Sequence, residues 1–214
     1  MKKKIKKVSS KKINEYWQTY YSQNQQDKAS NFAKFVSSKL NKKKIILADI
    51  GCGNGRDTVY FRKKGIRSFG YDQSQNIIKS NIIRYGNFFF KKNVCSKNIN
   101  FNKKCDVFYL RFFFHAITEN MEINLLKNLK NFSKKKSLFF CEFRTDQDPL
   151  IKKGKRISKY ERFTSHYRRF LKVKDFESRL IKYNYKILYC RRSKKYAIKD
   201  KDRPDICRMI FQND

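Results

Sequence analysis

From residue 44 to residue 143, short apolar runs alternate with segments of helical periodicity, and this alternation most limits the folds open to the chain. Apolar runs that end at turn residues are typical of buried parallel strands, and the spacing of apolar residues between them is typical of helices. The expected strands span 45–50, 67–72, 88–94, 105–110 and 137–143, and the expected helices span 57–64, 74–83 and 119–132. Repeated strand–helix units predict an α/β fold with a parallel sheet and helices on both faces.

The segments on either side extend the same domain. The expected elements there are helices at 11–21, 31–40 and 173–183, an irregular stretch at 145–170, and strands at 185–190, 194–199 and 206–211. Because no helix separates these last strands, they predict an antiparallel edge to the sheet. No Pro/Gly/Ser-rich linker divides the 214 residues, so we expect a basic tail at 1–11 and a single domain at 12–214.

The formal net charge of +35 at pH 7 has two interpretations. A dedicated basic surface would bind a polyanion such as nucleic acid. Alternatively, AT-rich codons inflate lysine, since only 15 of the 53 basic residues are Arg and residues with GC-rich codons are scarce. Nucleic-acid sites use Arg for bidentate contacts, so the composition favours codon bias, and nucleic acid is not the favoured partner.

Cysteine usage and hydropathy limit the cellular setting. The six Cys form no CxxC pair and have no His at zinc-ligand spacing, which argues against a metal site and a disulfide framework. No run of 18 apolar residues predicts a membrane span, and the basic start lacks the apolar region of a signal peptide. We therefore expect a cytoplasmic protein with free thiols and no bound metal.

The string DIGCGNGRD at 49–57 lies between the first expected strand and the first expected helix. Its glycines allow a tight turn and close approach of a ligand to the backbone. The string lacks the third glycine of GxGxxG and the GK[ST] of a P-loop. The second expected strand ends in Asp72, whose carboxylate could accept both hydroxyls of a ribose. A purely structural alternative is a tight turn at 49–55 with Asp72 as a helix N-cap.

This arrangement resembles the class I S-adenosylmethionine-dependent methyltransferases from about residue 44 to residue 143. The resemblance implies a Rossmann-like fold with a mostly parallel seven-stranded sheet, an antiparallel edge and helices on both faces. It implies S-adenosylmethionine as the cofactor, with the methionine amino group near Asp49 and the ribose hydroxyls at Asp72. The remaining cofactor-binding positions that it implies are Gly51, Gly53, Asn54, Gly55, Asn93 and Val94. Asn93 departs from the family pattern, which usually has an acidic residue near the adenine amine.

Three further segments resemble a subgroup of small bacterial methyltransferases: RFFFHAI at 111–117, EFRT at 142–145 and HYRRF at 166–170. The first two follow expected strands, where ligands bind in open α/β sheets. A hydroxyl acceptor must lose a proton, and His115 and His166 are the only histidines that could remove it. The hypothesis assigns catalysis to His115, His166 and Arg111, and acceptor binding to Glu142, Arg144, Tyr167 and Arg168.

Each of these assignments has a structural alternative. His115 could be a core histidine among phenylalanines, His166 could begin a helix, and the arginines could fix loops through ion pairs with Glu142 and nearby acids. Aromatic residues on the first helix could close over the cofactor, or could pack that helix. The resulting division is 12–43 for N-terminal helices or a lid, 44–144 for the cofactor-binding core, and 145–214 for a substrate-side part.

The sequence therefore predicts a methyltransferase that acts on a small-molecule or glycan-type acceptor, with transfer to oxygen. One alternative is an RNA methyltransferase that uses a Lys-rich surface. Another is a non-catalytic protein that binds S-adenosylmethionine without turnover. The residues at 109–112 are YLRF rather than NPPY or DPPY, which argues against methylation of adenine or glutamine amides.

Overall fold

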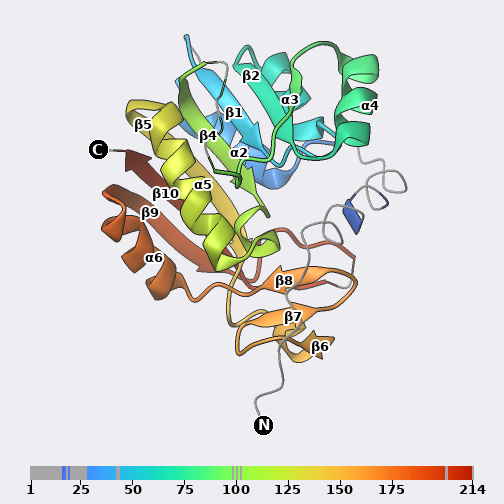
Figure 1. Cartoon of the computed structure of the whole chain (residues 1–214), viewed down its shortest axis with the longest axis vertical. Helices are drawn as coiled ribbons and strands as arrows, with labels where there is room; N and C mark the ends of the chain where they lie inside the picture. The colour runs from blue at the N-terminus through green and yellow to red at the C-terminus, as the bar shows by residue number, and fades with distance from the viewer. Residues whose placement is uncertain are drawn as a thin grey trace.

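The computed structural model describes residues 16–17, 19, 28–41, 44–97, 99, 101, 103–200 and 202–213. A seven-stranded sheet in the order β3-β2-β1-β4-β5-β10-β9 forms its centre (Figure 1). The expected tail at 1–11 lies outside the described residues. Of the expected helix at 11–21, only residues 16, 17 and 19 are described, and all three are helical.

The main sheet confirms the predicted fold class. Its strands are β1 (Ile46–Ile50), β2 (Arg67–Asp72), β3 (Phe89–Lys91), β4 (Cys105–Arg111), β5 (Ser133–Arg144), β9 (Tyr185–Ser193) and β10 (Ile206–Asn213). The five strands from β3 to β5 pair in parallel, while β10 is antiparallel to both β5 and β9. The parallel strands therefore end at one edge of the sheet, where a ligand site is expected.

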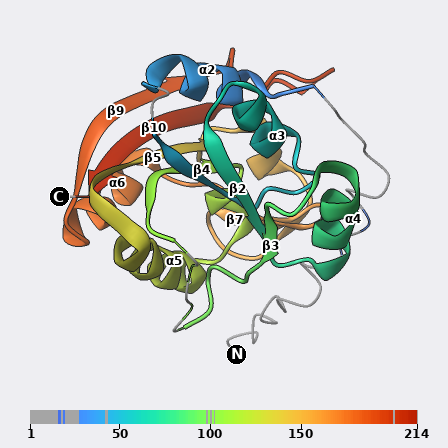
Figure 2. The same ribbon diagram turned by 90° about the horizontal axis from the view of Figure 1, so that it is seen from above.

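Helices cover both faces of the sheet (Figure 2). They are α2 (Asn31–Lys39), α3 (Arg56–Lys63), α4 (Gln75–Tyr85), α5 (Glu119–Phe132) and α6 (Val173–Lys182). α2 and α3 lie on one face, and α5 and α6 lie on the other. The side chains of Ser30, Ser74 and Thr118 accept hydrogen bonds from the first turns of α2, α4 and α5. These caps explain where the three helices begin.

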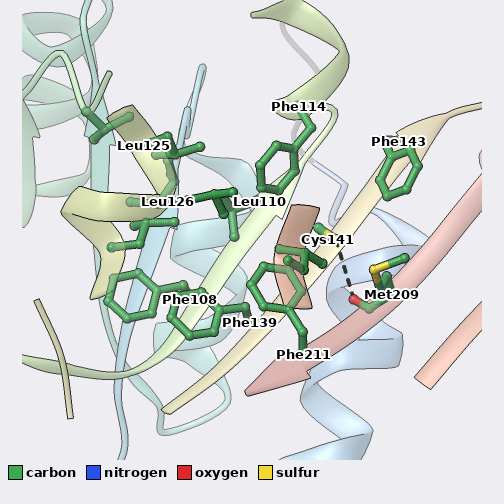
Figure 3. Close-up of a cluster of buried hydrophobic side chains, with 14 of the residues drawn as sticks. Phe108, Leu110, Phe114, Leu125, Leu126, Phe139, Cys141, Phe143, Met209 and Phe211 are labelled. Carbon is green, nitrogen blue, oxygen red and sulfur yellow. Dashed lines mark hydrogen bonds between the residues drawn. The ribbon is translucent and has the colours of Figure 1, made fainter. Parts of the chain in front are cut away.

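An aromatic core fixes α5 and α6 against the sheet (Figure 3). Phe139 lies at its centre, with its ring stacked between those of Phe108 and Phe211 at centroid distances of 4.8 and 4.9 Å. Leu125 and Leu126 of α5 are buried in the same cluster. Because each fully buried large side chain contributes roughly 1.5–3 kcal/mol, this cluster anchors the strand ends that carry the site.

Two expectations about the last third of the chain were wrong. Residues 145–170 are not irregular throughout, since they hold a three-stranded antiparallel sheet of β6 (Lys155–Arg156), β7 (Glu161–Phe163) and β8 (Tyr167–Arg169). Residues 194–199 form a loop rather than a strand. The short strands of the small sheet consist mostly of charged residues, with one aromatic residue each in β7 and β8, so the sequence carried little strand signal.

The small sheet lies beyond the carboxyl ends of β1 and β4, at the lower end of the molecule in Figure 1. β8 packs beside the short helix η1 (Phe114–Ala116), which follows β4, and a second short helix, η2 (Pro149–Lys152), precedes β6. The small sheet therefore forms a wall opposite the strand ends. Within the described residues, no helix is both long and apolar enough to span a bilayer.

Candidate active site

A cavity of about 320 Å³ opens between the carboxyl ends of the parallel strands and the small sheet. This volume is at the lower end of the range for small-molecule sites. One end is lined by residues that follow β1, β2 and β3, and the other by residues that follow β4 and by β8. Its polar lining includes Asp49, Asn54, Arg56, Asp57, Asp72, Asn93, Arg111, His115, Arg144, His166, Arg168 and Asp202.

Asp49 and Gly51 line the cavity where β1 ends. Asp49 is buried, and its carboxylate accepts a 2.6 Å hydrogen bond from the hydroxyl of Thr58. Burial raises the pKa of Asp49 to about 8, although the Thr58 bond opposes this shift. Gly51 has a φ of +72°, and a Cβ there would come within 2.5 Å of the Phe113 ring. Only glycine fits this turn without strain.

Asp72 joins the end of β2 to the glycine loop. Its carboxylate accepts the backbone N–H of Gly53 at 3.1 Å and that of Ser74 at 2.9 Å, and it lines the cavity. Burial raises its pKa, while the backbone hydrogen bonds lower it. The side-chain cap of the following helix is Ser74 rather than Asp72. Asp72 is therefore not the N-cap that the structural alternative expected.

The turn after β3 contributes Asn93 and Val94, which both line the cavity. The side-chain oxygen of Asn93 accepts the backbone N–H of Cys95 at 3.2 Å. This bond fixes the turn that places the buried Val94 in the wall. The turn therefore offers an apolar surface next to an amide group.

Gly53 and Gly55 are not among the described residues that line the cavity. The carbonyl of Gly53 accepts the side-chain amide of Asn81 at 2.7 Å, which ties the loop to α4. Gly55 precedes α3 with a φ of +76°, and a Cβ there would lie 2.7 Å from the Phe89 ring. These two glycines shape the loop, while Gly51 and Asn54 line the cavity itself.

His115 of η1 is buried at the other end of the cavity. Its Nδ1 accepts the backbone N–H of Arg144 at 3.3 Å. In the neutral ring the proton must then lie on Nε2. Burial lowers the pKa of His115 well below its ordinary value, and the charges of Arg168 and Arg144 lower it further. His115 is therefore neutral, with its one N–H on the nitrogen that has no hydrogen-bond partner among the described residues.

His166 precedes β8 and stacks on the aromatic residues near the N-terminus. Its ring lies 4.2 Å from that of Tyr16 and 4.7 Å from that of Trp17, measured between centroids. Ser165 lies 3.0 Å from its Nδ1, whereas Nε2 is buried without a partner among the described residues. Burial, with the charges of Arg168 and Arg144, lowers the pKa of His166 to about 2. Tyr16 and Trp17 also line the cavity.

The arginines of this end differ in their partners. Arg144 pairs with Asp148 at 2.8 Å and also with Asp202. Arg111 pairs with Glu142 at 3.2 Å. Arg168 donates through Nε to the Thr164 hydroxyl at 3.2 Å, and no ion pair joins it to a described carboxylate. Burial, together with the Arg144 charge, lowers the pKa of Arg168 to about 10, so it remains a cation at neutral pH.

Two residues expected at the acceptor site lie elsewhere. Glu142 is buried between Arg111 and Arg208, with the second ion pair at 2.8 Å, and is not among the described residues that line this cavity. Tyr167 is also absent from that lining, because alternate residues of a strand point to opposite faces. Its hydroxyl donates to Glu161 instead. The ion-pair alternative therefore describes the contacts of Glu142.

A family model described as a methyltransferase domain matches residues 20–189. The chain belongs to this methyltransferase family. It is an S-adenosylmethionine-dependent methyltransferase. No curated protein matches the sequence significantly.

Solved structures of similar fold agree with this membership. An S-adenosylmethionine-dependent methyltransferase from Methanosarcina mazei is 14% identical, with a TM-score of 0.68 over 84% of this chain and 96% of that chain. The glycopeptide N-methyltransferase MtfA with S-adenosylmethionine is 10% identical, with a TM-score of 0.67 over 89% of each chain. The [4+2]-cyclase SpnF is also 10% identical, with a TM-score of 0.68 over 94% of this chain and 93% of that chain. At such identities the likeness shows the fold alone.

The residues of this methyltransferase fit its cofactor. Gly51 lines the cavity without a Cβ, which would meet the Phe113 ring, and Asp49 and Asp72 place carboxylates in the cavity that would suit an ammonium group and ribose hydroxyls. A cation beside Asp49 would lower the raised pKa of that carboxyl. When bound, S-adenosylmethionine supplies a methyl group on a sulfonium, which needs alignment with an acceptor more than activation. Among the described residues, no cluster of three potential metal ligands is present.

Several residues of the methyltransferase cavity were missed at the level of sequence. Asp57 accepts the Ser30 hydroxyl and the Tyr109 hydroxyl at 2.8 and 2.7 Å, which links α3 to the start of α2 and to β4. The position of Asp57 in the first turn of α3, next to the glycine loop, is the sequence feature that could have indicated a place in the site. Asp202 and Lys199 reach the lining from the loop after β9, and no pattern in the sequence indicated this.

Proposed function

We propose that this methyltransferase transfers a methyl group to an oxygen atom of a small-molecule or glycan-type acceptor. The observation that carries the proposal is the enclosure of the cavity. The small sheet, with His166 and Arg168, lies opposite the strand ends, and Tyr16 and Trp17 add a further wall. Such a space suits a compact acceptor better than a nucleic-acid chain, which needs an open basic groove.

In this proposal the two ends of the cavity have separate tasks. Asp49, Gly51, Asn54, Asp72, Asn93 and Val94 hold the cofactor. Gly53 and Gly55 support the same loop from behind. Arg111, Arg144 and Arg168 give the other end a positive potential that favours an acceptor with negative charge. His115 and His166 lie at that end and orient the acceptor. Membership of the subgroup with RFFFHAI, EFRT and HYRRF segments, and a cytoplasmic location, belong to the same proposal.

The test begins with calorimetric titration of the protein with S-adenosylmethionine and S-adenosylhomocysteine. The expected result is micromolar binding that is lost in Asp72→Ala, because this carboxylate both contacts the cofactor and holds the glycine loop. The matched control is Asp106→Ala at the opposite end of β4, where the carboxylate accepts the backbone N–H of Ile46. This control is expected to bind the cofactor normally.

The acceptor class follows from labelled methyl transfer. Protein and methyl-labelled S-adenosylmethionine are incubated with the small-molecule fraction and with the RNA of a bacterial extract. Label is expected in the small-molecule fraction. Label in RNA would favour the alternative that uses the Lys-rich surface. Normal cofactor binding with no label in either fraction would favour a non-catalytic binding protein.

A further inference from the structure

Within the part of the chain that the structure describes, Arg168 is an arginine of the acceptor end that forms no ion pair with a carboxylate. Arg111, Arg144, Arg169, Arg179 and Arg208 each form an ion pair with a buried or partly buried carboxylate. Arg168 lines the cavity, and its Nε donates a hydrogen bond to the neutral hydroxyl of Thr164. Among the described residues no carboxylate forms an ion pair with it, although the charges of Asp148 and Asp202 act on it from a greater distance. A partly buried guanidinium of this kind is a ready site for a planar oxyanion.

His115 adds a second donor at the same end. Because its Nδ1 accepts the Arg144 backbone N–H, its Nε2 carries the proton and can only donate. The ring cannot turn without losing that bond to the backbone. His115 therefore suits an oxygen atom that accepts a hydrogen bond, and it does not suit the removal of a proton from a hydroxyl.

The remaining candidate bases of this end are also poorly suited to proton removal. The Nε2 of His166 is buried without a hydrogen-bond partner among the described residues, and the same burial and nearby arginines hold the pKa of this ring at about 2. Asp202 is engaged by Arg144, and Asp57 by Ser30 and Tyr109. An acceptor hydroxyl would therefore lack a partner for its proton. An acceptor that is already ionised needs none.

We propose that the acceptor is a carboxylate, which is bound by the Arg168 guanidinium with His115 Nε2–H as a second donor, and which is methylated on oxygen. A carboxylate has two oxygens in one plane, so one oxygen can accept from the Arg168 guanidinium and the other from His115. A carboxylate oxygen forms the new O–CH₃ bond with its own electron pair as the S–CH₃ bond breaks. The sulfonium and carboxylate charges disappear together, and no proton moves. This inference rests on the proposed function.

The walls beside Arg168 indicate what the rest of the acceptor is like. Phe112 and Phe113 line the cavity next to His115, and Tyr16 and Trp17 line it next to His166. Aromatic walls favour a flat apolar body. Suitable probes are therefore benzoate and phenylacetate, with benzamide and phenylacetamide as neutral matches and benzyl alcohol and phenol as hydroxyl acceptors.

The experiment measures transfer of labelled methyl groups from S-adenosylmethionine to each probe. Esters are expected from the carboxylates, recognised by release of labelled methanol in mild base, and no product is expected from the amides. Arg168→Gln is expected to lower kcat/KM for the carboxylates about 10- to 100-fold, the effect of losing a charge-assisted hydrogen bond. Arg156→Gln is the matched control, because this arginine is exposed on the same small sheet.

Binding separates the acceptor role of Arg168 from a role toward the cofactor. Calorimetry is expected to show unchanged affinity of Arg168→Gln for S-adenosylmethionine, and weaker binding of benzoate to its S-adenosylhomocysteine complex. A loss of cofactor affinity would overturn the inference, because Arg168 would then hold the carboxylate of the cofactor. Transfer to the hydroxyl probes alone would also overturn it while the proposed function stands. Transfer to none of the probes, with cofactor binding intact and label found in RNA, would contradict both.

Discussion

The two ends of the cavity hold their polar side chains in different ways. At the cofactor end, Asp49 and Asp72 are fixed by a hydroxyl and by backbone amides, without an arginine or lysine in ion-pair contact among the described residues. At the acceptor end, Arg111 and Arg144 are fixed by buried carboxylates. The first end therefore presents carboxylates to a cationic ligand, and the second presents donors to an anionic one.

The two ends also differ in how far apart their parts lie in the sequence. Asp49, Gly51 and Asp72 belong to two successive strand–loop–helix units, and their geometry follows from local turns. The acceptor end joins η1, the end of β5 and β8, together with Asp202 from the loop after β9. Local backbone geometry therefore positions the residues of the cofactor end, whereas ion pairs between distant parts of the sequence position those of the acceptor end.

The largest expected effect tests the ion pairs of the acceptor end. Glu142→Gln removes a buried charge that two arginines share, which leaves both arginines without their acid. Breaking a buried ion pair in this way is expected to lower the free energy of unfolding by about 3–5 kcal/mol. Urea denaturation measures the change.

The control for this substitution is Glu119→Gln. Glu119 has a 61% exposed side chain that lies 4.0 Å from Arg169, and its loss is expected to cost at most about 1 kcal/mol. If Glu142 contacted the acceptor instead, Glu142→Gln would lower turnover while the free energy of unfolding stayed close to that of the wild type. That result would contradict the distinction drawn between the two ends.

A smaller effect is expected from the backbone of the cofactor end. Gly51→Ala places a Cβ 2.5 Å from Phe113 at a φ of +72°, so it adds a steric clash to the strain of a left-handed residue. The expected cost is about 2–4 kcal/mol of unfolding free energy, with loss of S-adenosylmethionine binding. Thermal denaturation and calorimetry measure the two effects.

Gly65→Ala is the matched control, because Gly65 has a φ of +79° and open space around its Cβ position. It is expected to carry the backbone strain alone, about 1–2 kcal/mol, with cofactor binding unchanged. Equal losses in the two variants would mean that close packing against Phe113 does not shape the loop.

The same contrast explains what the sequence could predict. The alternation of strands and helices and the DIGCGNGRD string depend on local patterns, so the fold class and the positions of Asp49, Gly51 and Asp72 followed from them. The small sheet at 155–169 was missed because its strands are short and largely polar. The wrong strand at 194–199 has a related cause, since it was predicted from only three consecutive apolar residues, Tyr196, Ala197 and Ile198, between lysines.

The direction in which side chains point was the second property that the sequence could not predict. The HYRRF string placed Tyr167 and Arg168 together, but adjacent residues of a strand face opposite ways, and only Arg168 lines the cavity. The string could not reveal whether Tyr167 or Arg168 points toward the site, because the register of a short strand depends on the strands that it pairs with. The sequence also could not predict the ion pair between Glu142 and Arg208, since Arg208 lies on a strand far along the chain. The catalytic role of Arg111 stays a prediction, whereas the contacts of His115 and His166 favour a role in orienting the acceptor over the predicted removal of a proton.

The last prediction concerns pH, because the two ends should respond to it in opposite directions. The folded-state pKa of His166 is about 2, below the ordinary value of 6.5, so protons favour the unfolded chain and the contribution of His166 to stability is lost as pH falls below about 6.5. The folded-state pKa of Asp49 is about 8, above the ordinary value of 3.8, so its contribution is lost as pH rises from about 4 to 8.

Urea denaturation without cofactor at pH 5 and pH 7 separates the two contributions. Relative to His166→Gln, the wild type is expected to lose about 2 kcal/mol of unfolding free energy on going from pH 7 to pH 5. Relative to Asp49→Asn, it is expected to lose about 2–3 kcal/mol on going from pH 5 to pH 7. Parallel pH profiles for the wild type and His166→Gln would mean that the pKa of His166 in the folded protein is close to its ordinary value. His166 could then accept a proton near neutral pH, and the argument that the acceptor end lacks a base would fail.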